Sequence, residues 1–210
     1  MPRSRINASN GRSLNPSHSG PRRPNSRRPS VSMDWIRDFF SEMLAVEMGG
    51  IKLYQKALDG LEHPELEEKL TEFLEQTEHH AELCKQMLNA AGAEPDYVSP
   101  NAEIAEQKAE ALLSTEAVAE RSDVNNLENL VLAETKDHWN WEMLGSVATK
   151  IEDPELKSVV KKALREVSKQ EKRHVDWNQK ALTKIALELA MESPDEMESA
   201  SESEELEEKE

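Results

Sequence analysis

Apolar residues recur every three or four positions along the chain from Met33 to Met191, which is the pattern of amphipathic α-helices. Helix-breaking residues interrupt this pattern at only a few places, namely 60–64, 92–100 and 153–154. The interruptions divide the sequence into four long predicted helices, at about 34–60, 65–91, 124–150 and 155–190. The pattern therefore predicts an all-α protein.

The connections between these predicted helices differ in length. A short turn joins the first helix to the second, and another joins the third to the fourth, so each pair should form an antiparallel hairpin. The segment between Gly92 and Asn126 is too long for a tight turn and contains the helical stretch NAEIAEQKAEALLSTEAVAE. We expect this segment to be a long crossover in an antiparallel four-helix bundle.

The two predicted hairpins resemble one another in sequence. Their turns read LEHPEL (61–66) and IEDPEL (151–156), and QTEHHAELCKQML (76–88) aligns with QEKRHVDWNQKAL (170–182). Upstream of the turns, LAVE (44–47) aligns with VLAE (131–134). The alignment pairs Gln76 with Gln170, His80 with His174 and Glu47 with Glu134, and it indicates a duplicated helical hairpin.

Polar residues interrupt the apolar stripe of every predicted helix near its middle. Counting from Pro64 and Pro154 places them at one level of the bundle, and the residues that meet there are Glu47, His80, Glu134, Glu171 and His174. An unpaired carboxylate in a protein core costs several kcal/mol, and no lysine or arginine lies on these stripes at that level. Bound cations would balance the charge, and these ligand types suit iron or manganese, with zinc also chemically feasible.

A glutamate on one helix and Glu-x-x-His on the next, repeated after a crossover, resembles the ferritin-like superfamily of ferritins, bacterioferritins and rubrerythrins. The resemblance covers about 34–190, and VEMGGIKLYQKAL, EPDYVSP and LAETKDHWNW are similar to phrases of bacterial ferritin-like domain proteins. It implies a ferritin-like bundle with two iron ions. It makes Glu47 and Glu134 the single glutamates of the first and third helices, and Glu171 with His174 the Glu-x-x-His of the fourth.

The second predicted helix departs from this motif. Thr77 stands three residues before His80 and is a poor ligand for iron, whereas Glu78 is one residue further on and could turn inward. The expected metal ligands are Glu47, Glu78, His80, Glu134, Glu171 and His174, and the expected catalytic residues are Glu47, Glu134 and Glu171. The departure leaves open a complete dinuclear site, a single-metal site and a degenerate site. His138, beside Asp137, should support the site or pack, and Tyr54 and Trp141 should pack in the core.

If iron binds, the resemblance implies oxidation of ferrous iron by dioxygen or peroxide, with two iron ions where the site is complete. The alternative is a non-catalytic helical stress or interaction protein with a degenerate metal site, so the sequence leaves open whether the protein is an enzyme. The single cysteine, Cys84, excludes an internal disulfide and a cysteine-rich metal cluster. A homo-oligomer also stays open.

The formal net charge of -16 is unevenly distributed. Residues 1–32 contain seven arginines and no acid, and residues 192–210 contain ten acids and one lysine. Their compositions predict a disordered basic tail and a disordered acidic tail on either side of a bundle at 33–191. The bundle is itself acidic, which argues against nucleic acid as a partner.

The basic tail allows three interpretations, namely an arm for nucleic acid or an anionic surface, an organelle transit peptide, or upstream sequence preceding a start at Met33. We favour the last. No apolar run reaches the roughly 20 residues of a membrane helix, and the first thirty residues lack the apolar core of a secretory signal. We therefore expect a cytoplasmic protein without a membrane partner.

Overall fold

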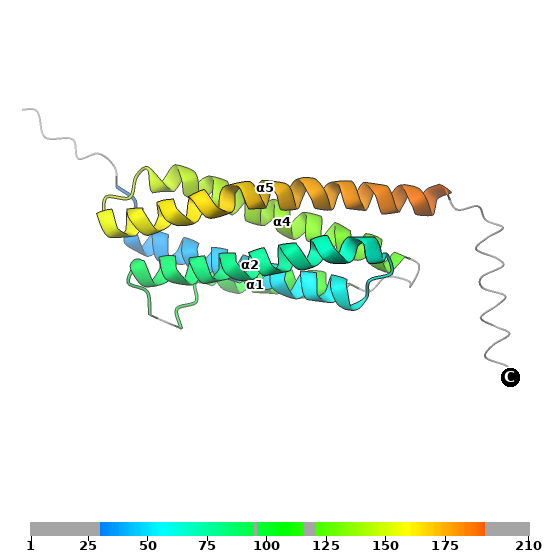
Figure 1. Ribbon diagram of the computed structural model, residues 1–210. Coiled ribbons are helices and arrows are strands. Elements are labelled where there is room, and N and C mark those ends of the chain that lie inside the picture. Colours follow the sequence, from blue (N-terminus) through cyan, green and yellow to red (C-terminus); the bar gives the residue numbers. More distant parts are fainter. Residues whose placement is uncertain (1–29, 95, 116–120, 192–210) are drawn as a thin grey trace, which may run out of the picture.

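The computed structural model describes residues 30–94, 96–115 and 121–191 (Figure 1). The four long helices are α1 (Met33–Asp59), α2 (Glu67–Ala90), α4 (Ser122–Ala148) and α5 (Pro154–Met191). A shorter helix, α3 (Pro100–Leu113), precedes α4, and a 3-10 turn, η1 (Pro64–Leu66), precedes α2. These ranges contain no strand, so the prediction of an all-α protein is confirmed.

The predicted tails, 1–32 and 192–210, fall outside the described residues except for 30–32. Helix α1 begins at Met33 and α5 ends at Met191. In the described ranges, every helix is too short or too polar to cross a lipid bilayer.

The long helices lie side by side, with α1 against α2, α4 against α5, α1 against α4 and α2 against α5 (Figure 1). Helix α3 packs on the outside of this group, along α1. Its start is held near the beginning of α1, where the Ser99 hydroxyl donates to the Asp38 carbonyl. Its end lies near the end of α1, where the Lys56 ammonium donates to the Leu113 carbonyl. Helix α3 therefore returns the chain along α1 before α4 begins.

Local signals in the sequence account for the helix boundaries. The Ser99 hydroxyl accepts a hydrogen bond from the backbone N–H of Ala102, so it caps α3 directly before Pro100. Asp153 does the same for α5, because its carboxylate accepts from the backbone N–H of Leu156. Gly92 follows α2 with a φ of 69°, a left-handed conformation that glycine adopts without steric cost. These signals therefore account for the end of α2 and for the starts of α3 and α5.

The core between the four long helices consists of two apolar clusters separated by a polar layer, and a small third cluster of alanines lies between α1 and α3. One cluster contains Phe40, Met87, Leu144 and Val160, and the other contains Tyr54, Phe73, Leu130 and Ile185. On each long helix, buried glutamate or histidine residues lie between the positions that contribute to the two clusters. Because a fully buried large apolar side chain stabilises a fold by about 1.5–3 kcal/mol, the clusters hold the helices together around the polar layer.

Candidate metal centre

Six ionisable side chains from the four long helices meet in the polar layer. They are Glu47 from α1, His80 from α2, Glu134 and Asp137 from α4, and Glu171 and His174 from α5. Each residue is at most 5% exposed, so water does not hydrate the carboxylates. The five residues that the sequence places at this level are therefore all buried together, and Asp137 joins them.

These six side chains form two groups that could each hold a metal ion. One group comprises Glu47, His80, Asp137 and Glu171, and the other comprises Glu134, Glu171 and His174. Within each group, one potential ligand atom from every residue lies within 4.8 Å of all the others. Glu171 belongs to both groups, and its two carboxylate oxygens allow it to serve two neighbouring ions.

Several atoms of the first group have no hydrogen-bond partner. They are Glu47 Oε2, His80 Nδ1, Asp137 Oδ1 and both carboxylate oxygens of Glu171. His80 Nδ1 and Glu171 Oε1 lie 2.8 Å apart, yet neither makes a hydrogen bond. Buried polar atoms are rarely left unpaired, because each costs about 1–3 kcal/mol. Oxygen and imidazole nitrogen atoms that converge without partners match the donor set of a bound cation.

Two glutamines orient the histidines. The Nε2 atom of His80 lies 2.9 Å from Gln170 Oε1, and the Nε2 atom of His174 lies 3.0 Å from Gln76 Oε1. An amide oxygen only accepts, so each imidazole donates its Nε2–H, and its Nδ1 lone pair faces the carboxylate cluster, where a cation could bind it. Each hairpin thus supplies the glutamine that orients the histidine of the other hairpin.

The amide of Gln76 is itself held in one orientation. Its oxygen accepts from the Arg173 guanidinium at 3.0 Å, and its nitrogen donates to the Glu72 carboxylate at 2.8 Å. Both contacts require the oxygen to point towards α5. The amide of Gln76 is therefore held with its oxygen, and not its nitrogen, facing His174.

The structure corrects the expectation for helix α2. Glu78 is exposed and lies outside both groups, so it is not positioned as a ligand. Thr77 is buried, but its hydroxyl donates to the Phe73 carbonyl at 2.9 Å. Asp137 on α4 adds a carboxylate to the cluster that the expected ligand set did not include. Asp137 stands three residues after Glu134, which puts both on one helix face.

A signal for Asp137 was present in the sequence. Glu134-x-x-Asp137 repeats the spacing of Glu171-x-x-His174, and both pairs consist of potential metal ligands. The expectation concerned His138 instead, as a residue that supports the site or packs. His138 is half-buried and belongs to neither group.

The cluster is strongly acidic, and its electrostatics favour protons or cations. Burial raises the pKa of Glu47, and the neighbouring Asp137 carboxylate raises it further. Burial likewise raises the pKa of Asp137 and of Glu171, with nearby carboxylates adding to both. Burial lowers the pKa of His80, which favours the neutral imidazole. Among the described residues, no lysine or arginine forms an ion pair with these groups.

Two buried aromatic residues contact the cluster besides packing in the core. The indole N–H of Trp141 donates to Glu47 Oε1 at 2.8 Å, leaving Oε2 as the oxygen without a partner. The Tyr54 hydroxyl accepts from the Asn178 amide at 3.1 Å. Burial, with the nearby Glu134 carboxylate, raises the pKa of Tyr54 and keeps its phenol neutral. Of the two aromatic residues, Trp141 orients the Glu47 carboxylate through its indole hydrogen bond.

The carboxylate and imidazole cluster could therefore hold metal ions, and its ligand atoms come from all four long helices. Comparison with protein-family models, with curated proteins and with solved structures gives no match to this chain.

Proposed function

We propose that the chain is a ferritin-like antiparallel four-helix bundle that binds two iron ions and oxidises ferrous iron with dioxygen or peroxide. The observation that carries this proposal is the pair of ligand groups that share Glu171 in the middle of the molecule. The two groups reflect the duplication of the hairpin, because each hairpin supplies the histidine of one group. Manganese has similar ligand preferences and is the second candidate metal.

The charge and chemistry of the cluster fit two divalent ions. The cluster contains four carboxylates, whose four negative charges two divalent cations would neutralise. Carboxylate oxygens and imidazole nitrogens are ligands that iron accepts. The buried atoms without hydrogen-bond partners would gain partners on metal binding, which removes their energetic cost.

In this proposal Glu47, His80 and Asp137 would hold one ion, Glu134 and His174 would hold the other, and Glu171 belongs to both groups. Bound iron would supply the one-electron steps by which dioxygen or peroxide is reduced. The protein residues bind and orient the ions, and the apolar clusters on both sides limit the access of water. Because the carboxylates lose protons when cations arrive, metal binding should release protons.

Metal content tests the proposal directly. Protein purified and loaded with ferrous iron without oxygen should contain about two ions per chain by elemental analysis, as the charge balance requires. Glu171→Gln removes the ligand shared by both groups and should reduce the content below one ion. Oxygen added to the loaded wild-type protein should produce ferric iron faster than it does in buffer.

Glu78→Gln is the matched control, because Glu78 is an exposed carboxylate on the same bundle and lies outside both groups. It should bind iron as the wild-type protein does. A metal-free wild-type protein, or equal iron in the wild type and in Glu171→Gln, would overturn the proposal.

One observation favours the alternative, a non-catalytic helical protein whose metal site has degenerated. Burial raises the pKa of Glu47, Asp137 and Glu171, so protons alone can reduce the charge of the cluster and permit folding without metal. Under this alternative, addition of iron leaves the unfolding temperature unchanged. Under the main proposal, bound iron raises it, because ligands of the folded state stabilise that state.

A further inference from the structure

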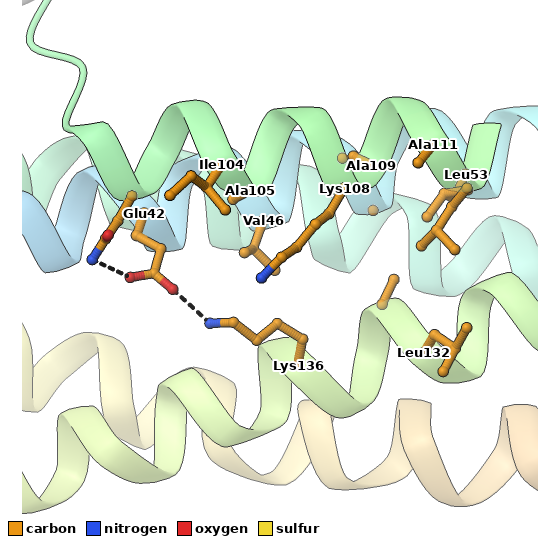
Figure 2. A pocket seen from close by; sticks show the side chains of 15 residues that line it. Glu42, Val46, Leu53, Ile104, Ala105, Lys108, Ala109, Ala111, Leu132 and Lys136 are labelled. Carbon is orange, nitrogen blue, oxygen red and sulfur yellow. Dashed lines mark hydrogen bonds and ion pairs between the residues drawn. The ribbon is translucent and has the colours of Figure 1, made fainter. Parts of the chain in front are cut away.

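A second feature lies outside the metal centre, in the space between α3 and α4. Both helices contact α1, and the cleft between them has a volume of about 620 Å³ (Figure 2). This volume lies within the range of small-molecule binding sites, which is about 300–1,000 Å³. The cleft extends along α1 from Glu42 to Leu53, or about 16 Å at about 1.5 Å per residue.

Hydrogen bonds close the cleft at both ends. At one end the Glu42 carboxylate accepts from Lys136 of α4 at 2.8 Å and from Asn101 of α3 at 3.3 Å (Figure 2). At the other end the Asn129 amide of α4 donates to the Leu112 carbonyl of α3 at 3.2 Å. The cleft is therefore closed at both ends, and it opens to solvent along the gap between α3 and α4.

The walls of the cleft are aliphatic. Apart from Glu42, Asn101, Lys108 and Lys136, the lining consists of Val46, Leu53, Ile104, Leu112 and Leu132 with several alanines and two glycines, and none of the described residues that line the cleft is aromatic. Ile104 and Leu132 are 48% and 60% exposed, which leaves their apolar surface available to a ligand. Such walls favour a flexible alkyl chain over a flat aromatic ligand.

One cation in the cleft has no counterion. Lys108 projects from α3 into the space above α4 (Figure 2), and among the described residues no carboxylate forms an ion pair with it. The other lining charges, Glu42 and Lys136, form an ion pair with each other at 2.8 Å. The lining of an otherwise acidic protein thus has an excess of one positive charge, which suits a ligand with one negative charge.

We propose that this cleft binds an amphipathic carboxylate with a single alkyl chain, such as a free medium-chain fatty acid. The carboxylate binds the ammonium groups of Lys108 and Lys136, and the alkyl chain lies along Leu53, Leu112 and Leu132. A headgroup of higher charge, such as a phosphate, would face only one unpaired ammonium. None of the lining residues is a proposed metal ligand, so binding does not depend on metal.

Calorimetric titration of the full chain with decanoate, below its micelle concentration, tests the proposal. One decanoate should bind per chain, in the presence or absence of metal. Decanol has the alkyl chain without the charge and butyrate has the charge with a short chain, so both should bind at least about tenfold more weakly.

Two variants locate the binding site. Lys108→Met removes the unpaired charge and Leu132→Ser removes an exposed part of the apolar wall, and each should weaken decanoate binding at least about tenfold. Lys161→Met is the control, because Lys161 is an exposed lysine of α5 outside the cleft. It should bind decanoate as the wild type does.

Three outcomes would overturn the proposal. They are the absence of saturable decanoate binding, equal affinity for decanol, and equal losses in Lys108→Met and Lys161→Met. If sedimentation showed instead a dimer that Leu132→Ser dissociates and decanoate does not affect, the cleft would be a contact between two copies of the chain.

Discussion

The imidazole of His80 and the amide of Gln170 connect the two hairpins across the centre of the molecule, with Nε2 and Oε1 2.9 Å apart. The equivalent pair, His174 and Gln76, makes the same connection in the opposite direction at 3.0 Å. Because the glutamine oxygens accept the Nε2 protons, they leave both Nδ1 lone pairs available to a cation that the carboxylates hold. Each copy of the duplicated hairpin therefore supplies a glutamine that orients the histidine of the other copy.

Gln170→Leu should weaken metal binding by about 10–100-fold, the usual effect of losing a residue that orients a metal-binding histidine. Gln170→Glu should restore most of the affinity, since a carboxylate also accepts the Nε2 proton. Competition between the protein and a coloured chelator measures both. Gln107→Leu changes an exposed glutamine of α3 and should have no effect, and an equal loss there would contradict the orienting role.

Asp137→Asn should reduce the metal content from about two ions to about one per chain, because the group of Glu134, Glu171 and His174 keeps its ligands. Elemental analysis after loading and removal of free iron gives the stoichiometry. Asp176→Asn changes an exposed aspartate of α5 and should keep both ions. Two ions in Asp137→Asn would show that Asp137 is not a ligand.

The metal-free protein should lose stability as the pH rises. Burial raises the pKa of Glu47, Asp137 and Glu171, so the folded state keeps protons that the unfolded chain releases above about pH 4. Because the folded state then binds more protons, the free energy of unfolding falls with rising pH until the folded pKa values are passed. The slope is at most about 1.4 kcal/mol per pH unit for each such group.

Urea unfolding of chelator-treated protein at pH 5, 6.5 and 8 measures this dependence. The Glu171→Gln variant has no titratable group at position 171, so its free energy of unfolding should fall less steeply with rising pH than that of the wild type. Glu78→Gln, which changes an exposed residue, should follow the wild type. Identical slopes in the wild type and Glu171→Gln would contradict the buried, protonated state.

Gly49→Ala and Gly145→Ala should change stability in opposite directions. A Cβ at Gly49 would lie 2.7 Å from the Cβ of Ala109 on α3, so α3 must shift, at a cost of about 1–3 kcal/mol. A Cβ at Gly145 meets nothing within 4 Å, and alanine there should stabilise α4 by about 0.5–1 kcal/mol. Thermal unfolding of both variants measures the difference, and equal shifts would show that α3 does not pack closely on α1.

The spacing of apolar residues determined the helices, because only one face of each helix can be buried. Pro64 and Pro154 mark the turns from which the level of the polar layer can be counted. Each helical residue advances the chain by a constant distance, so the number of residues from the turn gives the position along the bundle. Burial of Glu47, Glu134 and Glu171 follows from this count. So does the burial of both histidines, which lie on the same stripes.

Only the tertiary structure decided which neighbouring residues turn inward. Successive side chains on a helix point in directions that differ by about 100°. Rotation of the helix about its axis therefore decides which of two neighbouring side chains points into the core. Packing of Thr77 against α1 leaves Glu78 in solvent, and the rotation of α4 turns Asp137 rather than His138 towards Glu171. The glutamine contacts and the cleft beside α3 join residues far apart in the sequence. They depend on how whole helices dock, which periodicity within one helix does not encode.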